Sequence, residues 1–420
     1  MDTARPLPTR YNAVLSLIAL LPFGAGVIML DPDRAMLLGL SGFAIMLLPL
    51  AMLALWPEVR RGLFPRGSLT RICGLIFGFA ALLAFTRAPH TGFSFLALQF
   101  WLGAVIAGRA MQLGIQARGM RLGDAALLAI LTAGPLYVLL VPLMDMIYSE
   151  SRSIDWNRDM PGFNHVRKMG HLLTASAAVG LLTICLPNPN RRNGADIART
   201  VIGTLAIAFM IWSGARGAWL ALLAGGGLTL LIAQFTSQRL RLVRLTLMLS
   251  AALLLAILLP APGSHLGVLE SFTPSNTGFA DLNALSNNRL MIWTETLSLI
   301  KAAPLTGYGW GQFILLQDRY PVPQVHNFPL EILLALGLPM GAIAIAMILA
   351  LWVSANRCAA RGGTTTLTAL CVLNTMALYS LVSGTYYYGV PVVLTGLAWG
   401  ICLSTPPPAG NQRSSDTIAR

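Results

Sequence analysis

Charged residues are scarce in this 420-residue sequence, in which Asp, Glu, Lys and Arg together make up 11% of the positions. An average soluble protein has about 25%. Lysine is nearly absent and occurs only at Lys168 and Lys301, whereas hydrophobic residues make up 55%. A water-soluble core of this size would need far more polar covering than the sequence supplies. The composition therefore excludes an ordinary soluble domain and favours a chain embedded in lipid.

Signatures of metal, redox and hydrolase chemistry are also missing. The five cysteines are Cys73, Cys185, Cys358, Cys371 and Cys402. They lack CxxC spacing and fall in apolar runs or in loops that we assign to the cytoplasm, so we expect packing residues. There is no Walker loop or GxSxG elbow, and Asp31 and Asp33 form an Asp-x-Asp pair only in a minimal turn. His165 and His171 are six residues apart and do not share a helix face, so we expect no metal site and no cofactor.

The net charge of +13 is carried almost entirely by arginine. A nucleic-acid-binding domain would gather such residues on one polar face. Here they lie in short loops between apolar runs, where positive charge sets membrane orientation. We therefore exclude nucleic acid as a partner and expect membrane lipids around the chain.

Twelve apolar runs approach the length of about 20 residues that a membrane span needs. The runs fall near 12–30, 35–56, 72–87, 92–108, 125–145, 171–187, 200–214, 217–235, 245–263, 328–352, 366–384 and 389–404. The first run follows two arginines but no small-residue cleavage site follows it, which predicts an uncleaved span. Only the turn Ser-Gly-Ala-Arg-Gly at 213–217 separates the seventh run from the eighth, which predicts a helical hairpin or a re-entrant pair. The sequence thus predicts an all-α polytopic membrane protein of about twelve transmembrane helices.

Arginine is enriched in every second loop along the chain. The arginines of the loops on one side are Arg60, Arg61, Arg66, Arg71, Arg109, Arg118, Arg121, Arg191, Arg192, Arg199, Arg239, Arg241, Arg244, Arg357 and Arg361. With the two termini, this side holds 19 of the 29 basic residues but 5 of the 16 acidic ones. Because cytoplasmic loops are enriched in Lys and Arg, we predict that both termini are cytoplasmic and that the other face is periplasmic.

Four segments follow from this plan. They are transmembrane helices one to nine (1–263), a large periplasmic loop (264–325), helices ten to twelve (326–404) and a disordered cytoplasmic tail (405–420). Within the loop, candidate N-cap residues at 286–288 precede apolar residues at helical spacing, Leu290, Trp293, Leu297 and Ile300. This pattern predicts a short amphipathic helix on the outer membrane surface. Long loops of this kind are usually functional, so we expect the chemistry on this side.

Three outer residues are candidates for that chemistry. Arg216 lies in the tight turn at 213–217, and Arg289 opens the predicted amphipathic helix, where its guanidinium and the free backbone N–H groups could bind one anion. The alternative for both is contact with a lipid phosphate or a backbone carbonyl. His326 begins the stretch His-Asn-Phe-Pro-Leu-Glu, in which Asn327 suits an N-cap and Pro329 the first helical turn. A helix N-terminus disfavours imidazolium, so a neutral His326 suits a general base, although an ordinary hydrogen-bonded role stays open.

A second outer segment contains Asn164, Arg167 and Lys168 close together. These residue types at this spacing are more typical of the edge of a phosphate-binding site than of a metal site. Outer arginines, a neutral histidine and a surface helix together favour an enzyme that acts on a lipid-linked anionic substrate.

At these residues the chain resembles the O-antigen ligase and O-antigen polymerase superfamily. The resemblance lies in Trp-Ser-Gly-Ala-Arg-Gly-Ala-Trp at 212–219, in 288–293 and 304–313, in 326–331, and in 162–170 before the sixth span. The family transfers a glycan from undecaprenyl diphosphate to an acceptor without a nucleotide sugar or a metal. The resemblance implies a GT-C-like membrane fold in the bacterial inner membrane, with lipid A–core as the acceptor of the ligase branch.

The resemblance also implies roles for the candidate residues. Arg216 and Arg289 would bind the donor diphosphate, His326 would take the proton of the acceptor hydroxyl, and the anomeric centre would be inverted. Arg167, Asn164 and Asn327 would be secondary substrate contacts.

Two alternatives to a ligase stay open. The ligase pattern of His-Asn, nine residues and Gly is met by Gly337, but the next small residue, Gly341, comes one place late, so a polymerase of the same superfamily is the second reading. A flippase or transporter for polyprenyl-linked glycans is a reading of another class. Transporters usually have functional charge near the membrane midplane, whereas here the polar residues gather at the outer surface, which favours an enzyme.

Overall fold

The computed structural model describes residues 7–28, 38–62, 78–79, 82, 85–148, 166–186, 193–236, 240–260, 266–268, 288–316 and 324–404. Over these residues the chain is all-helical and has no strands. The helices are α1 (Thr9–Ile28), α2 (Leu38–Leu55), α3 (Pro57–Gly62), α5 (Thr91–Arg118), α6 (Arg121–Tyr148), α7 (Val166–Cys185), α8 (Asn193–Trp212), α9 (Arg216–Phe235), α10 (Leu242–Leu258), α12 (Arg289–Ala302), α13 (Phe313–Leu316), α14 (Phe328–Ala360), α15 (Thr364–Ser380), the 3-10 turn η2 (Thr385–Tyr387) and α16 (Gly389–Cys402).

Several of these helices suit a membrane. Five contain stretches long and apolar enough to cross one, at Arg121–Val141, Lys168–Cys185, Asn193–Trp212, Arg216–Phe235 and Phe328–Ala360, and α2, α10 and α16 hold shorter apolar stretches. A helix is suited to lipid because it satisfies its backbone hydrogen bonds internally. Helices occupy the predicted runs except for the third, most of which lies outside the described residues. The polytopic all-α class is confirmed, while the count of twelve spans stays a prediction.

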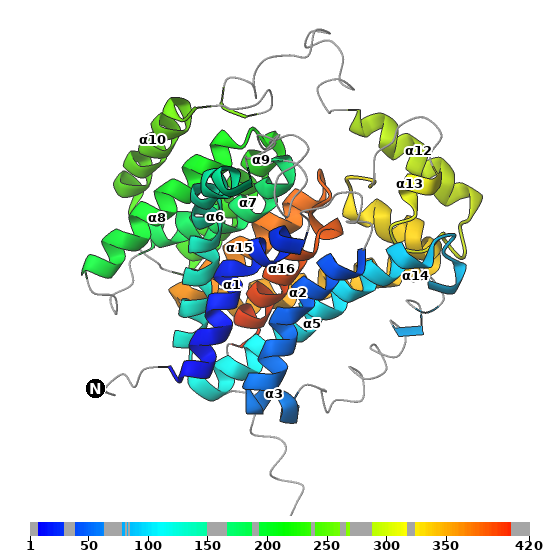
Figure 1. Ribbon diagram of the computed structural model, residues 1–420, viewed down its shortest axis with the longest axis horizontal. Helices are drawn as coiled ribbons and strands as arrows, with labels where there is room; N and C mark the ends of the chain where they lie inside the picture. The colour runs from blue at the N-terminus through cyan, green and yellow to red at the C-terminus, as the bar shows by residue number, and fades with distance from the viewer. Residues whose placement is uncertain are drawn as a thin grey trace, which may run out of the picture.

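The helices α15 and α16 form the centre of the molecule (Figure 1). Figure 1 shows α8 and α10 on one side of them and α12, α13 and the start of α14 on the other. Small residues allow the central helices to approach closely. A Cβ at Gly108 of α5 would lie 2.6 Å from the Gly396 carbonyl oxygen of α16, and a Cβ at Gly225 of α9 would lie 2.5 Å from the Thr375 backbone of α15. Such small-residue contacts are the usual way in which helices pack in lipid.

The turn between α8 and α9 is as tight as predicted, since α8 ends at Trp212 and α9 begins at Arg216. The two helices nevertheless diverge. α9 packs on α15 and α7, whereas α8 packs mainly on α7, α10 and α6. Each helix has 20 residues, and both are long and apolar enough to span a membrane.

The predicted loop helix is present as α12, and one detail of the prediction, the N-cap, is wrong. α12 buries Ile292, Thr296 and Ile300, whereas Leu290 and Leu297 of the predicted stripe are exposed. The reason is that α12 packs one narrow face, with residues four apart, against α14. Asn288 precedes the helix but adopts a left-handed conformation, and its side chain makes no capping hydrogen bond.

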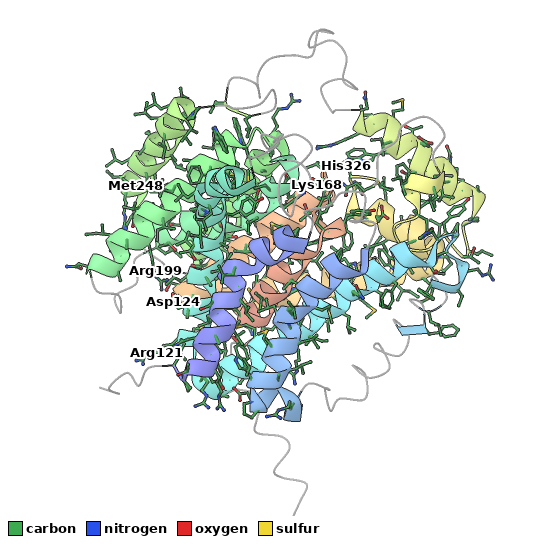
Figure 2. All side chains as sticks on the ribbon, viewed as in Figure 1. Arg121, Asp124, Lys168, Arg199, Met248 and His326 are labelled. Carbon is green, nitrogen blue, oxygen red and sulfur yellow. The ribbon has the colours of Figure 1, made fainter. Side chains whose placement is uncertain are left out.

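Two arginines of the predicted cytoplasmic side form a polar cluster with two acidic residues. Arg199 donates two hydrogen bonds to the Asp124 carboxylate, at 3.1 and 2.7 Å, and Arg244 lies 2.7 Å from Asp196. Figure 2 shows Arg121, Asp124 and Arg199 far from Lys168 and His326. One boundary differs from the prediction: α5 continues to Arg118, so Arg109 lies inside the helix, where its guanidinium donates to the Gly62 carbonyl.

Candidate functional site

His326 lies directly before α14, and the local sequence fixes its position. The Asn327 carboxamide oxygen accepts the Leu330 backbone N–H at 3.0 Å, and Pro329 occupies the first turn, so both predictions for this helix start are confirmed. The Asn327 NH₂ group also donates to the Leu381 carbonyl at 3.0 Å, which ties α14 to the end of α15. His326 itself has a φ of 57°. A non-glycine residue in this left-handed region is held there by its surroundings.

A glutamate strengthens the same helix start. The Glu331 carboxylate accepts the Val325 backbone N–H at 3.4 Å and also a hydrogen bond from the Gly311 backbone. One side chain thus connects the segment before His326 with the turn that contains Trp310. The sequence pattern alone assigned no role to Glu331.

The turn at 307–311 (Gly-Tyr-Gly-Trp-Gly) is held by a break in α14. Gly337 inside α14 has a φ of 75°, so the helix is interrupted there. The interruption frees backbone groups that the turn then uses: Tyr308 N–H donates to the Leu334 carbonyl at 2.9 Å, and Gly309 N–H donates to the Ala335 carbonyl at 3.0 Å. A broken helix is tolerated at membrane depth where protein satisfies its backbone.

The same turn is attached to α5 by a buried amide. The Gln312 NH₂ group donates to the carbonyls of His90 and Trp310, at 2.9 and 2.8 Å, and its oxygen accepts the His90 backbone N–H at 2.9 Å. The Ser94 hydroxyl also donates to the Trp310 carbonyl at 3.0 Å. These bonds hold the Trp310 turn beside the first part of α5.

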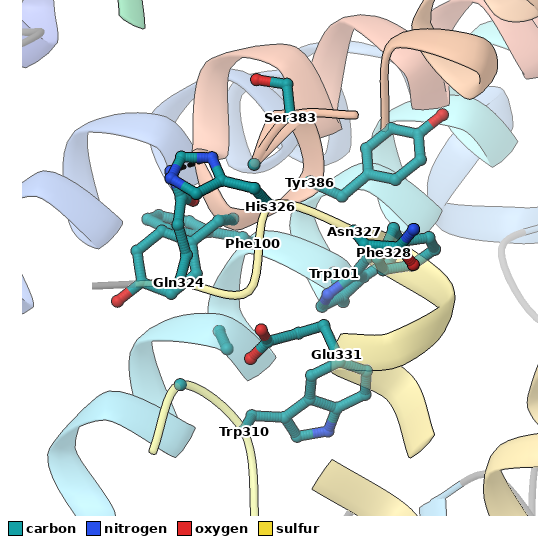
Figure 3. A pocket seen from close by; sticks show the side chains of 14 residues that line it. Phe100, Trp101, Trp310, Gln324, His326, Asn327, Phe328, Glu331, Ser383 and Tyr386 are labelled. Atoms are coloured by element: carbon teal, nitrogen blue, oxygen red, sulfur yellow. Dashed lines mark hydrogen bonds between the residues drawn. The ribbon is translucent and has the colours of Figure 1, made fainter. Parts of the chain in front are cut away.

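A pocket lies where these elements meet (Figure 3). It is lined by Ala97, Phe100, Trp101, Trp310, Gly311, Gln324, His326, Asn327, Phe328, Glu331, Ser383, Gly384, Tyr386 and Tyr387. Its aromatic wall is a packed cluster. The Trp101 ring stacks on Phe328 with centroids 5.2 Å apart, and Tyr386 contacts both rings edge-on at 5.7 and 4.7 Å. Figure 3 shows His326, Glu331 and Trp310 around the same space.

The connection from α15 to α16 closes the pocket. Its wall includes Ser383, Tyr386 and Tyr387. Gln324 Nε2 donates to the Tyr388 hydroxyl at 2.8 Å and lies 3.5 Å from His326 Nδ1. Burial raises the pKa of all three tyrosines at 386–388, so their phenols are neutral hydrogen-bonding groups at ordinary pH.

A buried histidine lies on the other side of His326. His171 of α7 is 2% exposed; its Nε2 lies 3.4 Å from the Ser383 hydroxyl and its Nδ1 lies 3.2 Å from that of Thr385. Arg289, Lys168 and His326 all act electrostatically on this imidazole, so the four residues belong to one neighbourhood. The Lys168 ammonium also lies 5.3 Å from the centre of the Tyr388 ring. The structure therefore brings together two predicted site residues, His326 and Arg289.

Arg216 lies at the same end of the molecule. It is the exposed first residue of α9. The preceding Ala215 packs on α7, because a Cβ at Gly170 would lie 3.1 Å from the Ala215 Cβ. Gly170 is adjacent to His171, so the Arg216 turn borders the neighbourhood of Arg289 and His326 without a described contact to either.

The structure does not describe the side chains of two further predicted site residues, Asn164 and Arg167. Asn164 lies outside the described residues, and Arg167 lies in α7 with a side chain whose position is outside the description. Within the described part of the chain, no group of three His, Cys, Asp or Glu residues is placed to hold a metal ion.

Much of the pocket could not be predicted from the sequence. Trp101, Gln324, Ser383 and Tyr386 come from segments that are far apart in sequence, and nothing in their local patterns distinguishes them from packing residues. The Trp310 turn belongs to the stretch at 304–313 that carries the family resemblance, but no role was predicted for it. A signal was present at Glu331, since a carboxylate in the first turn of an apolar helix has to be hydrogen-bonded.

Fold and site together define a polytopic helical membrane protein with a polar site at one end of its helices. Residues 201–345, about a third of the chain, match the family model described as O-antigen ligase. Over this segment the chain is similar to the O-antigen ligase family. The matched segment includes Arg216, Arg289, His326 and Asn327. No curated protein matches the chain.

Proposed function

We propose that the protein is an O-antigen ligase, which transfers a glycan from undecaprenyl diphosphate to a hydroxyl of lipid A–core. The observation that carries this proposal is the position of His326, which lines a pocket on one side and shares a neighbourhood with Arg289 and Lys168 on the other. A proton acceptor between a cationic region and a pocket suits a transfer from an anionic leaving group to a hydroxyl. The family's members are glycosyltransferase-like enzymes.

The proposed reaction needs one proton acceptor and charge neutralisation. Neutral His326 takes the proton of the acceptor hydroxyl as the hydroxyl oxygen bonds to the anomeric carbon. The bond from this carbon to the diphosphate oxygen breaks, and the leaving undecaprenyl diphosphate keeps its electron pair. Arg289 and Arg216 neutralise that diphosphate. Attack opposite the leaving group inverts the anomeric centre, and Asn164, Arg167 and Asn327 are proposed as secondary contacts.

The proposal also includes the membrane in which the protein lies and the side on which its pocket opens. The arginine-rich ends of the helices would face the cytoplasm of a bacterial cell, both termini would lie there, and the His326 pocket would open at the periplasmic face of the inner membrane. A lipid-linked donor could then approach from the membrane.

The direct test is transfer by the purified full-length protein, supplied with undecaprenyl-diphosphate glycan and lipid A–core, with products separated by mass. His326→Ala should lower transfer by roughly 10²- to 10⁴-fold, the usual contribution of a general base. His90→Ala is the matched control, because His90 is exposed and holds Gln312 through backbone atoms. Full transfer by the folded His326→Ala protein would overturn the assignment of the base.

The choice of acceptor separates the alternatives. A second molecule of donor in place of lipid A–core should give no extension if the protein is a ligase, and extension would identify a polymerase. Movement of the donor across liposomes without any bond formation would support a flippase.

The anion site has its own test. Arg289→Lys keeps the positive charge but loses the bidentate guanidinium, so we expect the KM for the donor to rise about tenfold. Arg357→Lys, at an exposed position near the opposite end of α14, is the control and should leave it unchanged. An unaltered donor KM in Arg289→Lys would argue against a diphosphate contact.

A further inference from the structure

The pocket beside His326 has two kinds of wall. Trp101, Trp310, Phe328 and Tyr386 provide aromatic surface. Glu331, Ser383 and the amides of Gln324 and Asn327 provide hydrogen-bonding groups. Ligand pockets generally combine apolar walls with a few fixed polar groups. A sugar ring matches this combination, because its C–H faces are apolar and its edge carries hydroxyls.

The distribution of charge divides the site in two. None of the described residues that line the pocket is lysine or arginine, and its one acidic side chain is Glu331. The cations Arg289 and Lys168 are instead found in the neighbourhood of His171. A diphosphate is stabilised by cations and bidentate guanidinium groups, so the pocket suits an uncharged, hydroxyl-bearing group, while the region of Arg289 suits the anion.

His326 belongs to both parts. It lines the pocket, and it acts electrostatically on His171 together with Arg289 and Lys168. A general base has to lie within hydrogen-bond reach of the hydroxyl that it deprotonates, and that hydroxyl has to lie beside the donor that it attacks. The pocket side of His326 is therefore the side on which a hydroxyl would be deprotonated.

The framework of the pocket is fixed before any ligand arrives. Gln312 and Ser94 hold the Trp310 turn on α5, and Glu331 holds it on α14. Gly384 leaves room for the Gln324 amide, which a side chain at this position would overlap. A prearranged site binds a ligand without the cost of ordering its own walls.

We propose that this pocket is the subsite for the acceptor sugar, the pyranose ring that carries the attacking hydroxyl. This inference rests on the proposed function. Trp310 and Trp101 border the apolar face of the ring, and Glu331 and Ser383 hydrogen-bond its hydroxyls, so that one hydroxyl lies against His326. Trp101, Ser383 and Tyr386 lie outside the segment that matches the family model, so acceptor selection involves parts of the chain that the match does not include.

The proposal is tested by separating the KM of the acceptor from that of the donor in the full-length protein. Trp310→Ala should raise the acceptor KM by roughly tenfold, which corresponds to the loss of about 1.4 kcal/mol of aromatic contact, and change the donor KM by less than about twofold. Trp310→Phe keeps an aromatic face and should recover most of the affinity. Glu331→Gln keeps the shape but not the carboxylate, and should also raise the acceptor KM.

Matched controls exclude general damage. Phe235→Ala removes an exposed aromatic residue from the C-terminal end of α9, and Glu295→Gln alters a carboxylate on α12 that does not line the pocket. Both should leave the two KM values unchanged. A rise in the donor KM alone, or no change of either in folded Trp310→Ala and Glu331→Gln, would overturn the proposal.

A binding experiment keeps this proposal distinct from the proposed function. Core oligosaccharide freed of its lipid should bind the wild-type protein in a calorimeter, and Trp310→Ala should weaken that binding by a similar factor. Binding that depends on Trp310, in a protein that transfers nothing, would support the sugar site and refute the ligase. If the wild type transfers the glycan but Trp310→Ala leaves oligosaccharide binding unchanged, the ligase function is supported and the sugar site is refuted.

Discussion

At the scale of single residues, His171 shows how a polar side chain can be both buried and satisfied. Its two ring nitrogens face the Ser383 and Thr385 hydroxyls, and its ring lies 4.6 Å from that of Tyr379. These contacts join α7 to the connection between α15 and α16, which forms one wall of the pocket. The His171 imidazole therefore holds this wall of the pocket in place from the side of α7.

Replacing this imidazole should weaken the fold. His171→Phe fills the space but leaves the Ser383 and Thr385 hydroxyls without that partner, and we expect the free energy of unfolding to fall by about 2 kcal/mol. His171→Gln, which can still hydrogen-bond, should lose clearly less. Thermal unfolding in detergent measures both. Equal stability of His171→Phe and the wild type would show that the two hydroxyls find other partners.

The sequence alone predicted part of the site at this scale. Asn327 and Pro329 were recognisable because helix capping is local, and the structure confirms both. His326 and Arg289 were recognisable as polar residues at the outer ends of helices, and the structure places them in one neighbourhood. Gln324 and Trp101 were not recognisable as site residues, because their role depends on contacts between segments that are remote in sequence. The bond from Ser94 to the Trp310 carbonyl, for example, spans 216 positions.

At the scale of helices, long apolar runs predicted most of the elements, because a span in lipid has to be both apolar and helical. The break in α14 could not be predicted in this way, since the run continues on both sides of Gly337. Pro339 lacks the N–H that would bond the Ala335 carbonyl, and the turn at 307–311 supplies hydrogen bonds to the interrupted helix instead. The contact between α12 and α14 could not be predicted for a similar reason, because helical spacing cannot tell contact with a neighbouring helix from contact with lipid.

Gly337 should be intolerant of any side chain. Its φ of 75° disfavours L residues, and a Cβ would lie 2.6 Å from the Leu305 carbonyl carbon. We expect Gly337→Ala to lower the free energy of unfolding by about 2 kcal/mol and to reduce transfer, because the Trp310 turn pairs with this break.

Gly227 provides the control for that substitution. It lies within α9, and a Cβ there would meet nothing within 4 Å. Gly227→Ala should be neutral or more stable by about 0.5–1 kcal/mol. Thermal unfolding of the two variants side by side checks both expectations, and equal stability would contradict the strain assigned to Gly337.

At the scale of the whole molecule, charge is divided between the two ends of the helices. The cluster of Arg199, Asp124, Arg244 and Asp196 lies away from Lys168 and His326 (Figure 2). The sequence predicted this division from its alternating arginines, because the positions of charged loops along a chain of spans determine their sides. Which end faces the cytoplasm is a prediction from composition.

Labelling of single introduced cysteines decides that orientation. Thr306 is exposed beside the Trp310 turn, and Gly363 is exposed between α14 and α15 with open space around a new side chain. A membrane-impermeant maleimide added to intact spheroplasts should label Thr306→Cys, whereas Gly363→Cys should react only after permeabilisation. Three of the four described native cysteines are buried, so the parent chain serves as the background. The opposite labelling pattern would place the His326 pocket in the cytoplasm, where a periplasmic glycan acceptor could not reach it.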